Sequence, residues 1–118
     1  MRIRDAFPDF GVELQQLLMA SSRADLADQL GTLELTTRCS CGENSCSTFY
    51  VAGGQSPLTE AQQKDRGPYW KESVVLDAQK GMIVVDLDRV DRIVGFEVLN
   101  RPDVEVQLAS ALDGRRAH

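Results

Sequence analysis

Residues 73–99 read SVVLDAQKGMIVVDLDRVDRIVGFEVL and hold the densest apolar run of the chain. Short runs rich in Val, Ile and Leu, bounded by turn residues, are typical of β-strands. Two groups of turn residues, 78–81 and 89–92, divide the stretch into three strands with tight connections. We therefore expect it to form the centre of an antiparallel sheet.

The middle and last of these strands are each expected to have one strongly apolar face. In the middle strand this face consists of Ile83, Val85 and Leu87. In the last strand it consists of Val94, Phe96 and Val98. The opposite face also has apolar residues, namely Met82, Val84, Ile93 and Leu99. We therefore expect partial cover on both sides of the sheet.

The N-terminal residues predict two short helices. Apolar residues at helical spacing favour a first helix over residues 10–20, with Asp9 as its N-cap. Ser22 begins an S-x-x-D pattern typical of a second helix start, and Gly31 fits the left-handed position after its end.

The next segment predicts a β-hairpin, because the apolar period changes from 3.6 to 2 after Thr32. The returning strand is expected over residues 47–52. In the long connection that follows, Ser56-Pro57 favours a short helix over residues 58–64. Asn100 is the expected cap of a final helix, with Gly114 at its end and residues 115–118 as a frayed tail.

This order predicts an α+β fold in a single domain over residues 1–118. Two N-terminal helices precede a five-stranded, mainly antiparallel sheet, and a C-terminal helix packs on that sheet. The length and the 42% hydrophobic content allow a core without disulfides or metal.

Residues 91–100, DRIVGFEVLN, form a hairpin and helix-start pattern. With the strands before it, over residues 74–100, the pattern resembles the core of YuzE-like small bacterial domains of unknown function. The resemblance covers about a quarter of the chain. It implies a strand, a hairpin and a following helix, and it implies no catalytic residues.

The charge balance narrows the classes of partner. The chain has 13 basic and 18 acidic residues and a net charge of −5. Because nucleic-acid binding requires phosphate neutralisation, we expect no nucleic-acid partner. The charge suits a basic protein, and it equally suits a solvated acidic surface.

Residues 1–14 lack an apolar signal segment, and no stretch is long enough for a membrane span, so we expect a cytoplasmic protein without membrane contact.

Three cysteines, Cys39, Cys41 and Cys46, gather at the predicted hairpin turn. Three thiols suit zinc, but a closed site needs a fourth ligand, and the only histidine is His118. If Cys41 pairs with Cys46, all three cysteines share one face. A register shifted by one residue instead places Phe49 and Val51 with the other apolar residues and turns Cys46 away. We favour the second register, with the cysteines as small buried hydrophobes; metal binding, redox chemistry and a disulfide remain the alternatives.

Other candidate site residues surround the last hairpin and the long connection. The acidic ones are Asp86, Asp88, Asp91 and Glu97, and the aromatic ones are Tyr69 and Trp70, with Tyr50 nearby. The carboxylates could contact a basic protein, bind a cation, or act as acid and base in an enzyme, and aromatic residues often anchor interfaces. The alternative interpretations are a solvated sheet edge and packing at the core rim.

No catalytic set is visible, because no internal histidine is present to activate a nucleophile and no phosphate-binding loop occurs. The leading hypothesis is a non-catalytic, bacterial-type domain for protein–protein interaction. An immunity protein that inhibits a basic effector or toxin fits this profile. The alternative is a metal-binding or redox protein that uses Cys39, Cys41 and Cys46. Self-association is compatible with both.

Overall fold

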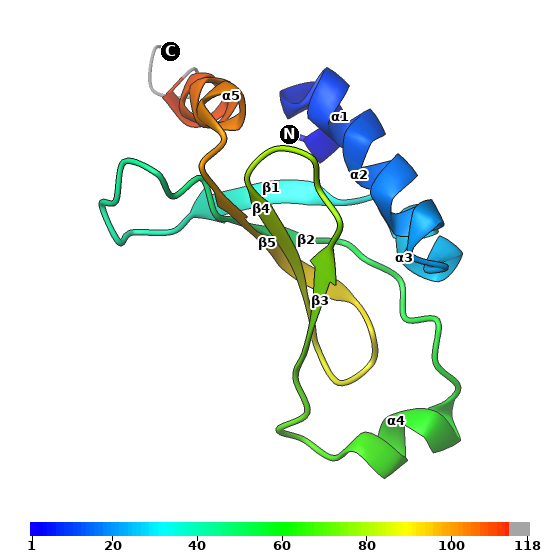
Figure 1. Ribbon diagram of the computed structural model, residues 1–118. Coiled ribbons are helices and arrows are strands. Elements are labelled where there is room, and N and C mark those ends of the chain that lie inside the picture. Colours follow the sequence, from blue (N-terminus) through cyan, green and yellow to red (C-terminus); the bar gives the residue numbers. More distant parts are fainter. Residues whose placement is uncertain (114–118) are drawn as a thin grey trace.

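The computed structural model describes residues 1–113 and shows an α+β fold (Figure 1). Its sheet is antiparallel throughout, with strand order β1-β2-β5-β4-β3. The strands are β1 (Glu34–Arg38), β2 (Phe49–Ala52), β3 (Glu72–Leu76), β4 (Met82–Leu87) and β5 (Ile93–Leu99). The stretch 73–99 therefore supplies the three strands β3, β4 and β5, as expected. The predictions for Gly114 and for residues 115–118 lie outside the described residues.

Four of the five helices lie on one side of this sheet. The helices are α1 (Ile3–Ala6), α2 (Pro8–Ala20), α3 (Ala24–Gln29), α4 (Glu60–Arg66) and α5 (Pro102–Asp113). Figure 1 shows α1, α2, α3 and α5 on the same side, whereas α4 lies apart, at the end of the sheet. The predicted C-terminal helix on the sheet is confirmed, α4 overlaps the short helix predicted over residues 58–64, and α1 adds to the predicted N-terminal pair. No helix among the described residues is long and apolar enough to cross a membrane.

The N-terminal helices begin and end differently from the prediction. Helix α2 begins at Pro8 with Phe7 as N-cap, so Asp9 lies in its first turn. Proline suits this position because it lacks the N–H that would be unpaired there. Helix α3 begins after Arg23 without a side-chain cap. The predictions of Asp9 and Ser22 as N-caps are therefore wrong. Gly31 is not among the residues with positive φ, so the predicted left-handed end is also wrong.

The later helix starts also moved. Helix α4 begins two residues further on than expected, because Thr59 and Gln62 form a reciprocal capping box in place of Ser56-Pro57. Helix α5 begins at Pro102, whereas Asn100 has a φ of 59° and lies two positions earlier. Asn100 therefore ends strand β5 and does not cap the helix.

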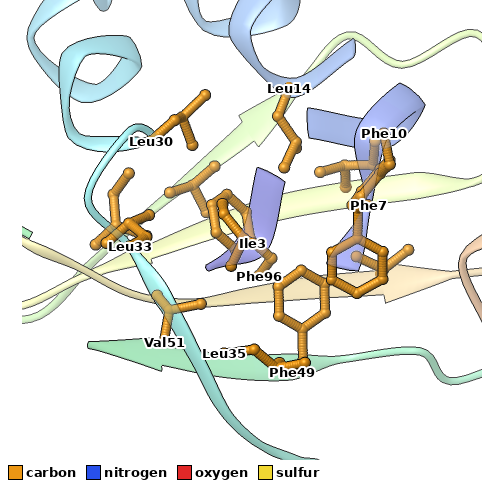
Figure 2. Close-up of a cluster of buried hydrophobic side chains, with 14 of the residues drawn as sticks. Ile3, Phe7, Phe10, Leu14, Leu30, Leu33, Leu35, Phe49, Val51 and Phe96 are labelled. Carbon is orange, nitrogen blue, oxygen red and sulfur yellow. The ribbon is translucent and has the colours of Figure 1, made fainter. Parts of the chain in front are cut away.

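The core lies between the helices and one sheet face (Figure 2). Phe7 stacks on Phe49 with ring centroids 4.8 Å apart, and Phe49 lies 5.4 Å from Phe96. The expected face of Ile83, Val85, Leu87, Phe96 and Val98 is buried here. Val94 is the exception: the ladder is irregular between Asp86 and Leu87, and Leu87 pairs with Ile93. Ile93 therefore takes the core position predicted for Val94.

The other sheet face carries no helix among the described residues. Val75 is 69% and Met82 50% exposed, whereas Val84 is 9% and Asp86 7% exposed, so this face is covered in part, as expected, although not by a described helix. We call this side the open sheet face; it carries Tyr50, Val75, Met82, Asp86 and Glu97.

Arg101 links helix α2 near the N-terminus to the start of helix α5. Its guanidinium is almost fully buried and forms paired hydrogen bonds to Glu13 of α2 (2.7 and 2.8 Å) and to Asp103 of α5 (3.0 and 2.9 Å). It also lies over the Phe10 ring, 5.3 Å from its centroid. A buried guanidinium is tolerated because two carboxylates compensate for its lost hydration.

Candidate metal centre

The cysteines lie in the connection between β1 and β2, and a bulge in β1 decides where they point. Leu35 pairs with Val51, but Thr37 pairs with Tyr50, because the register shifts between Leu35 and Thr37. The extra residue reverses the face of everything that follows it in the strand. Cys39 consequently leaves the core face, and its backbone N–H donates to the Thr48 carbonyl at 2.9 Å.

Because of this bulge, Phe49 and Val51 can lie in the core while the three cysteines lie close together, two arrangements that exclude each other in a regular hairpin. Phe49 and Val51 share the core with Leu33 and Leu35, as the favoured register predicts. The same register predicts that Cys39 and Cys41 join them, and this prediction is wrong. Its prediction that Cys46 turns away from this core face is confirmed, because Cys46 pairs with Leu99, which lies on the same face as Met82. Cys41 is exposed and Cys39 half-buried, so a role for these two as buried hydrophobes is excluded; only Cys46 is buried.

The three thiol groups face one another. The Sγ atoms of Cys39, Cys41 and Cys46 all lie within 4.8 Å of one another. Sulfur atoms around a tetrahedral zinc ion are about 3.8 Å apart, given a Zn–S bond of about 2.3 Å. A contraction of about 1 Å or less would therefore bring all three sulfurs into bonding distance of one ion.

Two of the thiols have shifted pKa values, and in both cases the residue two positions later is the largest single influence. The Thr48 hydroxyl and backbone N–H lower the pKa of the Cys46 thiol. The Glu43 N–H acts to lower the pKa of Cys41, but the neighbouring Cys46 and Cys39 thiols outweigh this effect and raise it. Donors that point at cysteine sulfurs stabilise the thiolate form that binds metals.

An ion pair fixes the end of the cysteine loop to α5. Arg38 donates two hydrogen bonds to Glu105 at 2.9 and 2.8 Å and one to the Cys46 carbonyl at 3.1 Å. The Ser47 hydroxyl also donates to Glu105, at 2.9 Å. The Arg38 guanidinium, and then Ser47, hold the pKa of Glu105 below its ordinary value of 4.5. Cys46 is therefore held in place independently of any metal.

A cavity of about 510 Å³ surrounds the thiols, and Glu43, Asn44 and Ser40 line it beside the three cysteines. Glu43 offers a carboxylate, and water has access, so either could supply a fourth ligand. No histidine lies among the described residues, because His118 is outside them. Three sulfur ligands with one open position are typical of exchangeable or reactive metal sites, in contrast to closed structural ones.

The residues that sequence reasoning missed are Arg38, Thr48 and Glu105. Arg38 and Glu105 are 67 positions apart, so only the tertiary fold brings them together. Thr48 follows Cys46 by only two positions, so its closeness to this cysteine is the one contact of the three that the sequence could have indicated.

The predicted acidic group does not form one site. Asp88 accepts hydrogen bonds from the backbone N–H groups of Val90 and Arg92 and pairs with the Arg92 side chain. Asp91 forms ion pairs with Arg66 and Arg23. These two carboxylates therefore hold the β4–β5 turn together and have their partners within the chain.

Asp86 and Glu97 differ from them, because both lie on the open sheet face. Asp86 accepts a hydrogen bond from the Ser73 hydroxyl at 2.8 Å. The Asp86 carboxyl, together with desolvation, raises the pKa of Glu97 above its ordinary value of 4.5. Tyr69 and Trp70 lie elsewhere, before β3. Tyr69 is 96% exposed, and Trp70 lies under the Arg66 guanidinium, 5.0 Å from its ring centroid.

Comparisons with known proteins add no relative: no protein-family model, no curated protein and no solved structure matches the chain. The cysteine cluster and the open sheet face are therefore the two features of the chain that indicate a function.

Proposed function

We propose that this protein binds a thiophilic metal ion, Zn²⁺ in the first place, through Cys39, Cys41 and Cys46. The observation that carries the proposal is the convergence of three sulfur atoms within 4.8 Å on a half-exposed loop. Thiolates favour Zn²⁺, Cu⁺ and iron–sulfur clusters over harder cations. A disulfide between any two of the three would leave the third thiol in the same cavity and remove the site.

The expected role of the ion is not to hold the fold together. The hydrophobic core lies on the other side of the sheet from Cys39, and the Arg38–Glu105 pair fixes the loop to α5. A surface ion with three protein ligands exchanges more readily than one in a closed four-ligand site. The proposed function is therefore reversible metal binding, with the fourth position open to water, to Glu43 or to a ligand from another molecule.

Metal titration of the reduced protein tests this. We expect one Zn²⁺ or Co²⁺ per chain, with the thiolate-to-cobalt charge-transfer band as the spectroscopic signature. Cys39→Ser, Cys41→Ser and Cys46→Ser should each weaken binding by about 100-fold or more. Ser40→Ala, in the same loop, is the matched control and should change it less than about twofold. Three free thiols without metal uptake, or uptake that survives replacement of all three cysteines, would overturn the proposal.

A second candidate function is binding to a basic protein, including inhibition of a basic effector or toxin. The observation that favours it is the position of Asp86 and Glu97 on a sheet face that no described helix covers. The two candidates are compatible, because the cysteines lie at a corner of the sheet and the carboxylates near its middle.

A further inference from the structure

The open sheet face has a defined layout. Val75 pairs with Val84, and Val84 pairs with Glu97, so these three form one row across the strands. The next row on the same face contains Asp86 and, across Gly95, Tyr50. A carboxylate pair therefore lies near the middle of the face, with apolar side chains around it.

Asp86 is unusual among the buried carboxylates. It is 7% exposed, yet no arginine or lysine among the described residues forms an ion pair with it. Asp91, at 6% exposed, pairs with two arginines. Lys71 is close enough to lower the pKa of Glu97, although it forms no ion pair with that carboxylate either. The fold therefore supplies cations to one end of β4 and leaves the carboxylates on its open face without one.

Val84, next to this pair, is buried, at 9% exposed, whereas the apolar residues further out are accessible. Val75 is 69%, Met82 50% and Tyr50 41% exposed. The Tyr50 ring lies directly over Gly95, where a Cβ would come within 3.0 Å of it. Interface cores are usually apolar with a polar rim, so a carboxylate pair among apolar side chains requires a cationic group from the partner to compensate for its desolvation.

We propose that the open sheet face docks a basic protein surface that places an arginine or lysine side chain over the Asp86–Glu97 pair. The inference rests on the second candidate function and names its contact site. Arginine and lysine fit because an aliphatic stem can lie on Val75 while the cationic group reaches the carboxylates. A second copy of the chain would bring the same carboxylates toward its own, and nucleic acid would bring phosphates, so charge opposes both.

The test uses the full chain labelled with ¹⁵N and a short peptide in which one arginine lies between leucines. The matched peptide carries neutral citrulline in place of the arginine. NMR titration gives the affinity and the contact site together. We expect amide shifts to concentrate at Tyr50, Val75, Met82 and Glu97, and the citrulline peptide to bind more weakly.

Glu97→Gln should weaken arginine-peptide binding by about fivefold to tenfold, because one charged acceptor is lost. Glu60→Gln, an exposed position on α4, makes the same change in net charge and should change binding less than about twofold. Equal effects of the two variants, or shifts at another surface, would overturn this contact site while leaving basic-protein binding standing. No binding of either peptide would contradict both, and concentration-dependent broadening of the same amides without peptide would assign the face to self-association instead.

Discussion

The β4–β5 and β1–β2 hairpins share one core but end in opposite kinds of connection. In the β4–β5 turn, Asp88 accepts three hydrogen bonds and Asp91 pairs with two arginines, so its carboxylates are used within the chain. The β1–β2 connection instead turns the thiols of Cys39, Cys41 and Cys46 toward one another around a cavity. Residues that look reactive in the sequence are therefore structural in one hairpin and available to a ligand in the other.

If both hairpins belong to one core, their strands should contribute equally to stability. Substitutions in these strands should therefore have the largest effect on the free energy of unfolding. Phe49→Ala in β2 and Phe96→Ala in β5 should each lower the free energy of unfolding by about 3–5 kcal/mol, because both rings are fully buried. Chemical denaturation of the two variants measures this. A loss below about 1 kcal/mol for Phe49→Ala alone would mean that the β1–β2 hairpin is an appendage.

The two connections should differ sharply in their contribution to stability. Asp88→Ala removes a side chain that accepts bonds from two backbone N–H groups and should cost about 1–2 kcal/mol. Asn44→Ala in the cysteine loop is the matched change at an exposed position and should stay within about 0.5 kcal/mol. Thermal unfolding of the metal-free proteins compares them, and equal losses would remove the distinction between the two connections.

The smallest effect concerns the ion pair that fixes the cysteine loop. The folded-state pKa of Glu105 is lowered, so its contribution is present above the ordinary value of 4.5 and is lost as pH falls through the folded value. Because both side chains are about one-third exposed, we expect Glu105→Gln to cost about 1 kcal/mol or less at pH 7. The difference in the free energy of unfolding between Glu105→Gln and the wild type should disappear in acid. Unfolding measured with chelator at both pH values tests this, and a difference that persists in acid would contradict the assigned cause.

The sequence predicted the sheet well where patterns were local and strong. Residues 73–99 alternate clearly and have turn residues at both connections, so their three strands follow from the chain itself. Helix starts were less predictable, because Pro8 and Thr59 competed with equally plausible caps nearby.

The candidate site depended on two features that no local pattern reveals. The bulge at Thr36 and Thr37 contains no glycine or proline, so the strand reads as regular although its register shifts. The partners of the acidic residues are also distant: Arg66 lies 25 positions from Asp91. Without this contact, Asp91 cannot be distinguished from Asp86 and Glu97.

Arg101 has a consequence for the order of folding. Its pair with Glu13 joins residues 88 positions apart, and contacts of such long separation form slowly because a large loop must close first. During synthesis, the α2 side of this contact is complete long before its partner exists. The N-terminal helices therefore cannot complete their packing until the start of α5 has been synthesised. Chains that stop before residue 101 are expected to leave the region around Phe10 exposed to proteases and prone to aggregation.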